Sequence, residues 1–265
     1  TQFEQDDKMA VMLSIKDISE QKQQAVLIDS LTHRDSATGL LNRPTVINLI
    51  KGFFQSSDQE QNYSIVYFNA SRLKEIDEVY GHLVHDSVLK HLADNLLIRF
   101  GDEFTGRISE NEFLVWCVEK DYRQLERMAN RLLESYSSKI SVSGFEFDIG
   151  LKAVFVRSSS SFANFEDFSY VGLYALTEMK FTGKRELVTV DDNLIKRSQE
   201  SLALNRDIMK ALKSGEIVAH YQPIVNASTG QVVGFEALAR WRHPTLGMVS
   251  PGLFVPLAEQ RRLIV

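Results

Sequence analysis

The stretch RFGDEFTGRISENEF, residues 99–113, decides the fold because it holds two similar acidic segments, GDEF at 101–104 and SENEF at 109–113. Apolar residues recur every three or four positions across residues 83–97, which predicts an amphipathic helix. Gly101 follows this segment as a glycine suited to the end of a helix. The first acidic segment is therefore predicted to follow a helix end.

The second acidic segment lies between residues 105–108 and the apolar run 113–118. That run, FLVWCV, is rich in the residue types that strands favour. We therefore predict that Ser109-Glu110-Asn111 forms a hairpin turn between two strands, with Glu110 at its tip.

Further strands and helices are expected to alternate along the chain. Residues 63–68, YSIVYF, are typical of a buried strand. Helices are predicted at 45–54, 121–136 and 165–181, and strands at 140–142, 145–156 and 186–190. This pattern, with antiparallel pairs among the strands, predicts an α+β fold.

The sequence after the 63–68 strand resembles the GGDEF family of diguanylate cyclases. It matches the family pattern DxDxFKxINDxxGHxxGDxxL at Lys74, Ile76, Gly81, His82, Asp86 and Leu89. Residues 35–43, DSATGLLNR, resemble the DxLTGLxNR motif of the family, with Ala37 in place of the usual leucine. The resemblance places the family's signature turn at residues 109–113 and implies a nucleotidyl-cyclase-like sheet flanked by helices.

The chain departs from the family at the positions that carry its chemistry: Asn69, Ser109, Glu110, Asn111 and Glu112. The resemblance implies that the first Asp of DxD and the third signature residue bind metal in active relatives, and here they are Asn69 and Asn111. A neutral amide binds a divalent cation weakly and cannot act as a base. We therefore predict a degenerate domain without a tightly bound metal, with an active diguanylate cyclase as the alternative.

GTP binding is a separate question from catalysis. The resemblance implies possible nucleotide contacts at Lys74, Asp77, Asp86, Lys180 and Lys184. The alternative interpretation is a solvated face that keeps the family pattern. Arg99 and Asp102 have the letters of the family's RxxD inhibition motif but lie one residue too far upstream, so we interpret them as a coincidence.

A second resemblance begins near residue 214. Residues 216–225 and 232–241 are predicted to be two strands joined by a turn at 226–231. They contain YQPIV and GFEALARW, which resemble the opening of an EAL phosphodiesterase domain, a (β/α)₈-type barrel.

The EAL resemblance implies that Glu236 is a catalytic ligand of Mg²⁺ or Mn²⁺, and that Gln222 and Arg240 bind cyclic di-GMP. A structural salt bridge at the barrel end is the alternative role for Glu236. Because the later acidic ligands of such a barrel are not in the chain, we expect no hydrolysis by these residues alone.

The N-terminal residues resemble the exit of a PAS sensor domain, with a strand at 8–16 and a polar helix at 20–34. Apolar residues of this helix have the spacing of a two-helix seam, which allows a homodimer; packing on its own domain is the alternative. We expect residues 1–33 to form this PAS exit, 34–192 the degenerate GGDEF domain, 193–213 a linker helix and 214–265 the start of the EAL domain.

Composition limits the remaining classes. A net charge of −5 gives no general attraction to nucleic acid or to an anionic membrane. No apolar run approaches the ~20 residues of a membrane span, and the lone Cys117 fits a reducing cytoplasm. We predict a cytoplasmic cyclic di-GMP signalling protein whose GGDEF domain regulates an EAL phosphodiesterase; a non-enzymatic cyclic di-GMP or GTP receptor is the other alternative.

Overall fold

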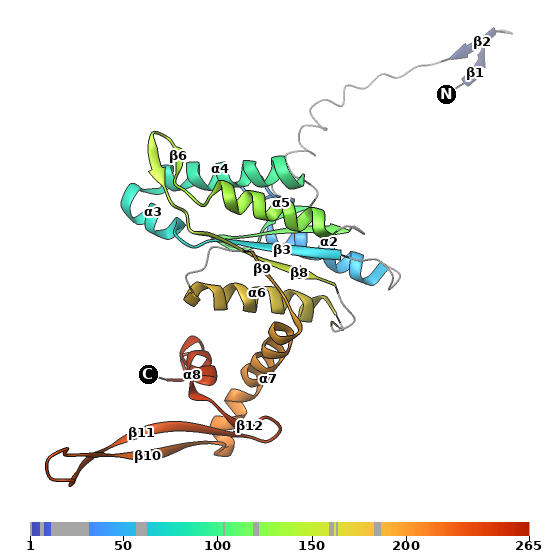
Figure 1. The fold of residues 1–265 in the computed structure, drawn as a ribbon. Helices are drawn as coiled ribbons and strands as arrows, with labels where there is room; N and C mark the ends of the chain where they lie inside the picture. The colour runs from blue at the N-terminus through green and yellow to red at the C-terminus, as the bar shows by residue number, and fades with distance from the viewer. Residues whose placement is uncertain are drawn as a thin grey trace. The chain divides into compact units, whose positions relative to one another are not determined.

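The computed structural model describes residues 2–5, 8–11, 32–56, 63–102, 104–118, 122–158, 162, 164–182 and 187–264. The chain divides into two compact units (Figure 1). The first contains Thr1–Ser159 and Leu176–Thr189, and the second contains Ser160–Ala175 and Val190–Val265. Most of the helix predicted at 20–34 lies outside the described residues.

A five-stranded mixed sheet forms the centre of the first unit. Its strand order is β4 (Thr105–Arg107), β5 (Glu112–Val118), β3 (Tyr63–Ala70), β8 (Leu151–Arg157) and β9 (Leu187–Thr189). All neighbours are antiparallel except β8 and β9, which are parallel. This sheet and its flanking helices confirm the predicted α+β class.

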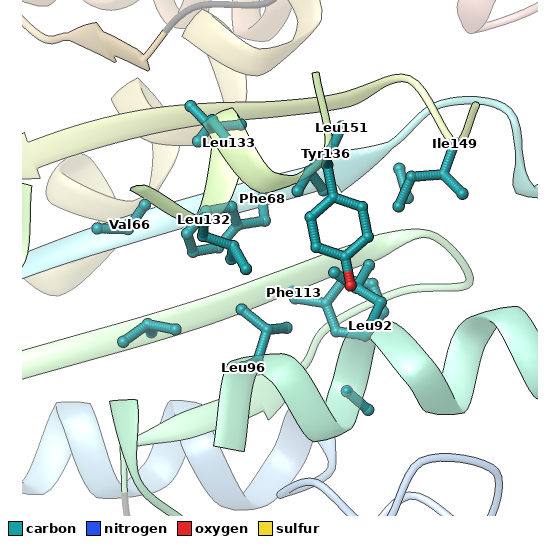
Figure 2. Close-up of a cluster of buried hydrophobic side chains, with 14 of the residues drawn as sticks. Val66, Phe68, Leu92, Leu96, Phe113, Leu132, Leu133, Tyr136, Ile149 and Leu151 are labelled. Atoms are coloured by element: carbon teal, nitrogen blue, oxygen red, sulfur yellow. The ribbon is translucent and has the colours of Figure 1, made fainter. Parts of the chain in front are cut away.

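Helices α2 (Arg43–Ser56), α3 (Leu73–Tyr80), α4 (His82–Phe100) and α5 (Tyr122–Ser135) belong to the same unit. The alternating residues Val66 and Phe68 of β3 face α4 and α5, whose apolar sides meet them. Figure 2 shows Leu92 and Leu96 of α4 and Leu132 and Leu133 of α5 in this core. The core therefore lies between one face of the sheet and these two helices.

Both parts of the prediction for residues 99–113 are confirmed. Helix α4 ends at Phe100, and Gly101 follows it with φ +86° and donates its N–H to Leu97 O at 2.9 Å. Strands β4 and β5 pair antiparallel on either side of residues 108–111, so Glu110 lies in the hairpin turn.

The strand predicted at 145–156 is wrong as a continuous element. Its first residues form β7 (Phe145–Phe147), which pairs with β6 (Ile140–Val142), and β8 starts only at Leu151. The break is stabilised from another part of the chain, because Arg72 contacts Asp148 at 2.6 Å and Ser71 Oγ donates to Gly150 O at 3.0 Å. Gly150 has φ +61°, and a Cβ there would lie 2.5 Å from Ser71 Oγ, so only glycine fits.

The N-terminal strand prediction also needs correction. The described part of the 8–16 segment is β2 (Lys8–Val11), and it pairs antiparallel with β1 (Gln2–Gln5). The sequence pattern missed β1, because QFEQ is short and mostly polar.

The second unit begins its continuous part with helix α7 (Asp192–Ser214), which the predicted linker helix 193–213 matches. A three-stranded antiparallel sheet of β10 (Ile217–Val225), β11 (Val232–His243) and β12 (Gly247–Val249) follows, then α8 (Pro251–Gln260). Its small core is Leu204, Ile208, Ala211, Trp241, Val249, Phe254 and Ala258.

Helix α6 (Phe165–Thr182) contributes its first part to the second unit and its last part to the first. None of the helices in the described part of the chain has the length and hydropathy needed to cross a membrane.

Candidate functional site

The positions at which the chain departs from the expected family pattern meet at one end of the sheet, where β3 ends. Asn69 is fully buried and lies directly opposite Glu112 on β5 and Lys152 on β8. Directly opposed residues of antiparallel strands point to the same side, so the three side chains form a row on one face. Asn69 Nδ2 donates to Glu112 Oε1 at 3.5 Å, and Asn69 Oδ1 is buried with no hydrogen-bond partner among the described residues.

The hairpin turn adds a second donor to the Glu112 carboxylate. Ser109 Oγ donates to Glu112 Oε2 at 3.1 Å, and the Ile108 N–H donates to the Glu112 carbonyl oxygen at 2.9 Å. The Ala70 N–H donates to Asn111 O at 2.9 Å, which ties the turn to the end of β3. The predicted residues Asn69, Ser109, Asn111 and Glu112 are therefore brought together, with Glu110 exposed beside them.

Arg107 anchors the turn to the loop at the start of the domain. Its guanidinium donates to Ser109 O at 3.1 Å and to Glu110 O at 2.7 Å. It also contacts both oxygens of Asp35, at 3.1 and 3.2 Å. Burial alone raises the pKa of Asp35, but the hydrogen bonds from Thr38 and the charge of Arg107 together outweigh burial and lower that pKa.

The loop at the start of the domain is also anchored near the start of β4. Arg34 forms a two-pronged pair with Asp102, with both N–O distances 2.7 Å. The hydrogen bonds from Arg34 lower the pKa of Asp102, against a smaller effect of burial. Asp102, one letter of the RxxD look-alike, is thus already engaged by an arginine of this chain.

Backbone packing completes the attachment of this loop. Leu41 forms a parallel bridge with Gly106. A Cβ on Gly106 would lie 2.8 Å from the Val46 side chain, so this approach of β4 to α2 requires glycine.

Three of the residues predicted to contact GTP lie on α3 and α4, each beside a neighbour on the same or the next helix. Lys74 Nζ lies 3.7 Å from Glu78, Asp77 lies 2.6 Å from His82, and Asp86 lies 3.0 Å from His85. The Lys180 side chain and Lys184 lie outside the described residues.

Lys152 is a buried charged residue that the sequence reasoning missed. It is 8% exposed, and its Nζ donates to the Met179 carbonyl oxygen in the last turn of α6 at 2.9 Å. A cation near a helix C-terminus satisfies the free carbonyls there. Its position as the only ionisable residue before Arg157 in the apolar strand LKAVFVR was the available signal.

In the second unit, the three predicted EAL residues share one face of a two-stranded ribbon. Gln222 of β10 lies directly opposite Glu236 of β11, and Arg240 follows four residues later on the same strand. Since side chains alternate along a strand, these three point to one side, and Ala239 and Trp241 point to the other, toward the small core. The Glu236 and Gln222 side chains are exposed.

Across the described residues, no group of at least three His, Cys, Asp or Glu side chains is placed to hold a metal ion. The row of Asn69, Glu112 and Lys152 at the end of β3 offers one carboxylate and one buried amide, so its donor set does not suit a divalent cation. The ribbon exposes one carboxylate, Glu236, of a type that can bind such ions.

Comparison with known proteins identifies relatives over nearly the whole chain. An uncharacterized signaling protein of Caulobacter vibrioides is 29% identical over 96% of this chain and 32% of its own length. The cyclic di-GMP phosphodiesterase PdeR of Escherichia coli is 29% identical over 98% of this chain and 39% of its own. The bifunctional diguanylate cyclase/cyclic di-GMP phosphodiesterase MucR of Pseudomonas aeruginosa is 25% identical over 97% of this chain and 39% of its own length. The chain thus spans about a third to two fifths of the length of these curated relatives.

Solved structures share the fold. The S helix-GGDEF-EAL part of Vibrio cholerae LapD, bound to c-di-GMP, matches with a TM-score of 0.60 and 17% identity over 92% of this chain and 57% of that one. The coiled coil and GGDEF domain of DgcB from Caulobacter crescentus, in complex with c-di-GMP, matches with a TM-score of 0.58 and 13% identity. This match covers 65% of this chain and 93% of that one.

Family models match both parts of the chain. Residues 205–265 match the EAL domain, which includes the ribbon with Gln222, Glu236 and Arg240. Residues 32–168 match the diguanylate cyclase GGDEF domain, and this region holds the β4–β5 hairpin and the row at the end of β3. Because this match covers more than half of the chain, the protein belongs to the GGDEF domain family.

Proposed function

We propose that this chain is part of a cyclic di-GMP signalling protein in which a catalytically degenerate GGDEF domain regulates an EAL phosphodiesterase. The observation that carries the proposal is the pairing of Asn69 with Glu112 at the end of β3. Phosphoryl transfer on GTP needs anionic oxygens that hold a divalent cation and activate a hydroxyl. The amides at Asn69 and Asn111 supply neither.

The β10–β11 ribbon supports the phosphodiesterase part of the proposal. Gln222 and Glu236 are directly opposed and exposed on the same face as Arg240. In the complete barrel, Glu236 would hold Mg²⁺ or Mn²⁺, which supplies an activated water for cutting a phosphodiester. Arg240 would bind a phosphate of cyclic di-GMP through charge-assisted hydrogen bonds, and Gln222 would position the substrate.

The relatives support the same substrate class. The names of PdeR and MucR include cyclic di-GMP phosphodiesterase, and the matching LapD structure has c-di-GMP bound. A GGDEF domain that has lost synthesis and precedes an EAL domain in the same chain is positioned to transmit a signal to it.

Two assays test the proposal. Purified chain with GTP and Mg²⁺ is expected to yield no cyclic di-GMP, and product formed in proportion to enzyme would overturn the degenerate assignment. A protein that joins this chain to a complete EAL domain is expected to hydrolyse cyclic di-GMP, with a loss of at least ~100-fold for Glu236→Gln because a metal ligand is removed. Equal hydrolysis by the Glu236→Gln variant would contradict the role of Glu236.

A further inference from the structure

At the end of β3, side-chain hydrogen bonds of Asn69, Glu112 and Ser109 occupy the position where the family pattern places a catalytic cation. Asn69 has no exposed surface, and its amide nitrogen faces one oxygen of Glu112 at 3.5 Å. The other Glu112 oxygen accepts the Ser109 hydroxyl at 3.1 Å. Both oxygens of the carboxylate therefore face donors from this chain.

The orientation of the Asn69 amide follows from this neighbour. If the amide were turned over, its oxygen would face the carboxylate oxygen, and two acceptors would repel each other. The donor orientation leaves Oδ1 buried and without a described partner, which is a cost of about 1–3 kcal/mol for a buried polar atom. The donor contact with Glu112 favours this orientation of the amide despite that cost.

A divalent cation does not fit between these groups. Mg²⁺ requires oxygen ligands in near-octahedral geometry at ~2.0–2.1 Å. Asn69 presents an N–H group to Glu112 where a metal site needs an acceptor. The third residue of the signature turn, Asn111, is also an amide.

The geometry points to a cation-independent latch made of Asn69, Glu112 and Ser109, in which hydrogen-bond donors of the chain replace a metal ion as partners of the Glu112 carboxylate. The latch joins the end of β3 to the β4–β5 hairpin turn. The backbone bond from Ala70 N to Asn111 O, 2.9 Å long, lies beside it. This inference deepens the proposed function because it concerns the same degenerate site, yet it concerns stability and not turnover.

A single isosteric substitution tests the latch. Asn69→Asp removes the donor and places a second carboxylate against Glu112, and two carboxylates at this separation disfavour full ionisation of both. At pH 8 in EDTA, thermal unfolding of the GGDEF unit in the full chain is expected at a temperature lower by ~5 °C than in the wild type. Mn²⁺ should restore most of this loss in the variant and should leave the wild type unchanged.

Two controls separate charge from packing. Asn69→Ala removes the donor without adding charge, so it should be destabilised equally in EDTA and in Mn²⁺. The double variant Asn69→Asp/Glu112→Gln carries a single carboxylate, so it should fold without the cation even if Asn69→Asp alone does not fold.

The outcomes are distinct. A wild-type chain stabilised by Mn²⁺ as much as the Asn69→Asp variant would overturn the latch, as would an Asn69→Asp variant as stable as the wild type in EDTA. Cyclic di-GMP synthesis in the GTP assay would overturn the proposed function, whereas these melting shifts address the latch alone.

Discussion

At the scale of single residues, the Tyr136 hydroxyl is a polar atom that the core of the first unit does not satisfy. Figure 2 shows the Tyr136 ring among the apolar side chains Phe113, Leu92 and Ile149. Tyr136 is 4% exposed, and its hydroxyl has no hydrogen-bond partner among the described residues. Burial raises the pKa of Tyr136, so the hydroxyl stays neutral in the physiological range.

Removing this hydroxyl should not destabilise the protein. Tyr136→Phe keeps the ring and deletes an unsatisfied polar group, so the free energy of unfolding is expected to stay the same or rise by up to ~1 kcal/mol. Tyr136→Ala, by contrast, should lower it by about 3–5 kcal/mol because the ring leaves a cavity. Urea unfolding measures both. A loss above ~1 kcal/mol for Tyr136→Phe would mean that the hydroxyl makes a hydrogen bond in solution.

At the scale of elements, two arginine–carboxylate pairs fasten the loop before α2 to both ends of β4. Arg34 and Asp35, adjacent residues of opposite charge, pair with Asp102 before β4 and with Arg107 at the end of β4, respectively. Arg107 also donates to two carbonyl groups of the turn. Its side chain therefore connects the loop that contains Asp35 to the signature turn.

The Asp35–Arg107 contact predicts a pH dependence. The pKa of Asp35 is lowered in the folded state, so the contact contributes stability that is full above the unfolded value of 3.8 and is lost as the pH falls through the lower folded value. Asp35→Asn should therefore reduce the free energy of unfolding by about 1.5–3 kcal/mol at pH 7 and by progressively less as the pH falls below 3.8.

Urea unfolding of the wild type and the variant at several pH values checks this. Glu146→Gln, which neutralises an exposed carboxylate on β7, is the matched control and should change stability by less than ~0.5 kcal/mol. The same stability difference for Asp35→Asn at pH 7 and pH 3 would contradict the assignment.

At the scale of the whole molecule, two clusters of buried apolar residues in the described part of the chain differ in size. The cluster in the first unit contains 23 residues from several helices and strands, whereas the cluster formed by α7, β11, β12 and α8 in the second unit contains 7. Stability rises with the apolar area removed from water. The second unit is therefore expected to unfold at lower denaturant concentration than the first.

The chain's two tryptophans allow this to be measured, because Trp116 lies in the first unit and Trp241 in the second. Fluorescence of a Trp241→Phe variant reports the first unit, and that of a Trp116→Phe variant reports the second. The Trp116 variant should have the lower urea midpoint. Coincident midpoints in the two variants would show that the units unfold as one cooperative body.

Local rules explain which elements were predicted correctly. The end of α4 at Gly101 and the turn at Glu110 depend on helical spacing, a glycine C-cap and strand-forming residues within about 20 positions, and all of these are visible in the sequence. The family pattern likewise located Asn69, Asn111, Glu236, Gln222 and Arg240. Their roles stay predictions, since identity of position does not establish chemistry.

Nonlocal contacts explain what the sequence could not show. The break between β7 and β8 depends on Ser71 and Arg72, which lie nearly 80 residues earlier in the chain. The pairing of Arg34 with Asp102 joins residues that are 68 positions apart. Neither has a periodic pattern or a turn signal, so no local rule could find them.

By itself, the sequence determined the α+β class, the end of α4, the position of the signature turn and the amides at Asn69 and Asn111, because these depend on residue type and short-range spacing. Only the tertiary structure decided that the Asn69 amide faces Glu112, that Arg107 joins the turn to Asp35, and that Gln222 and Glu236 oppose each other. The physical reason is strand register: it places side chains from distant segments within hydrogen-bonding distance, and it is set by the packing of the whole sheet.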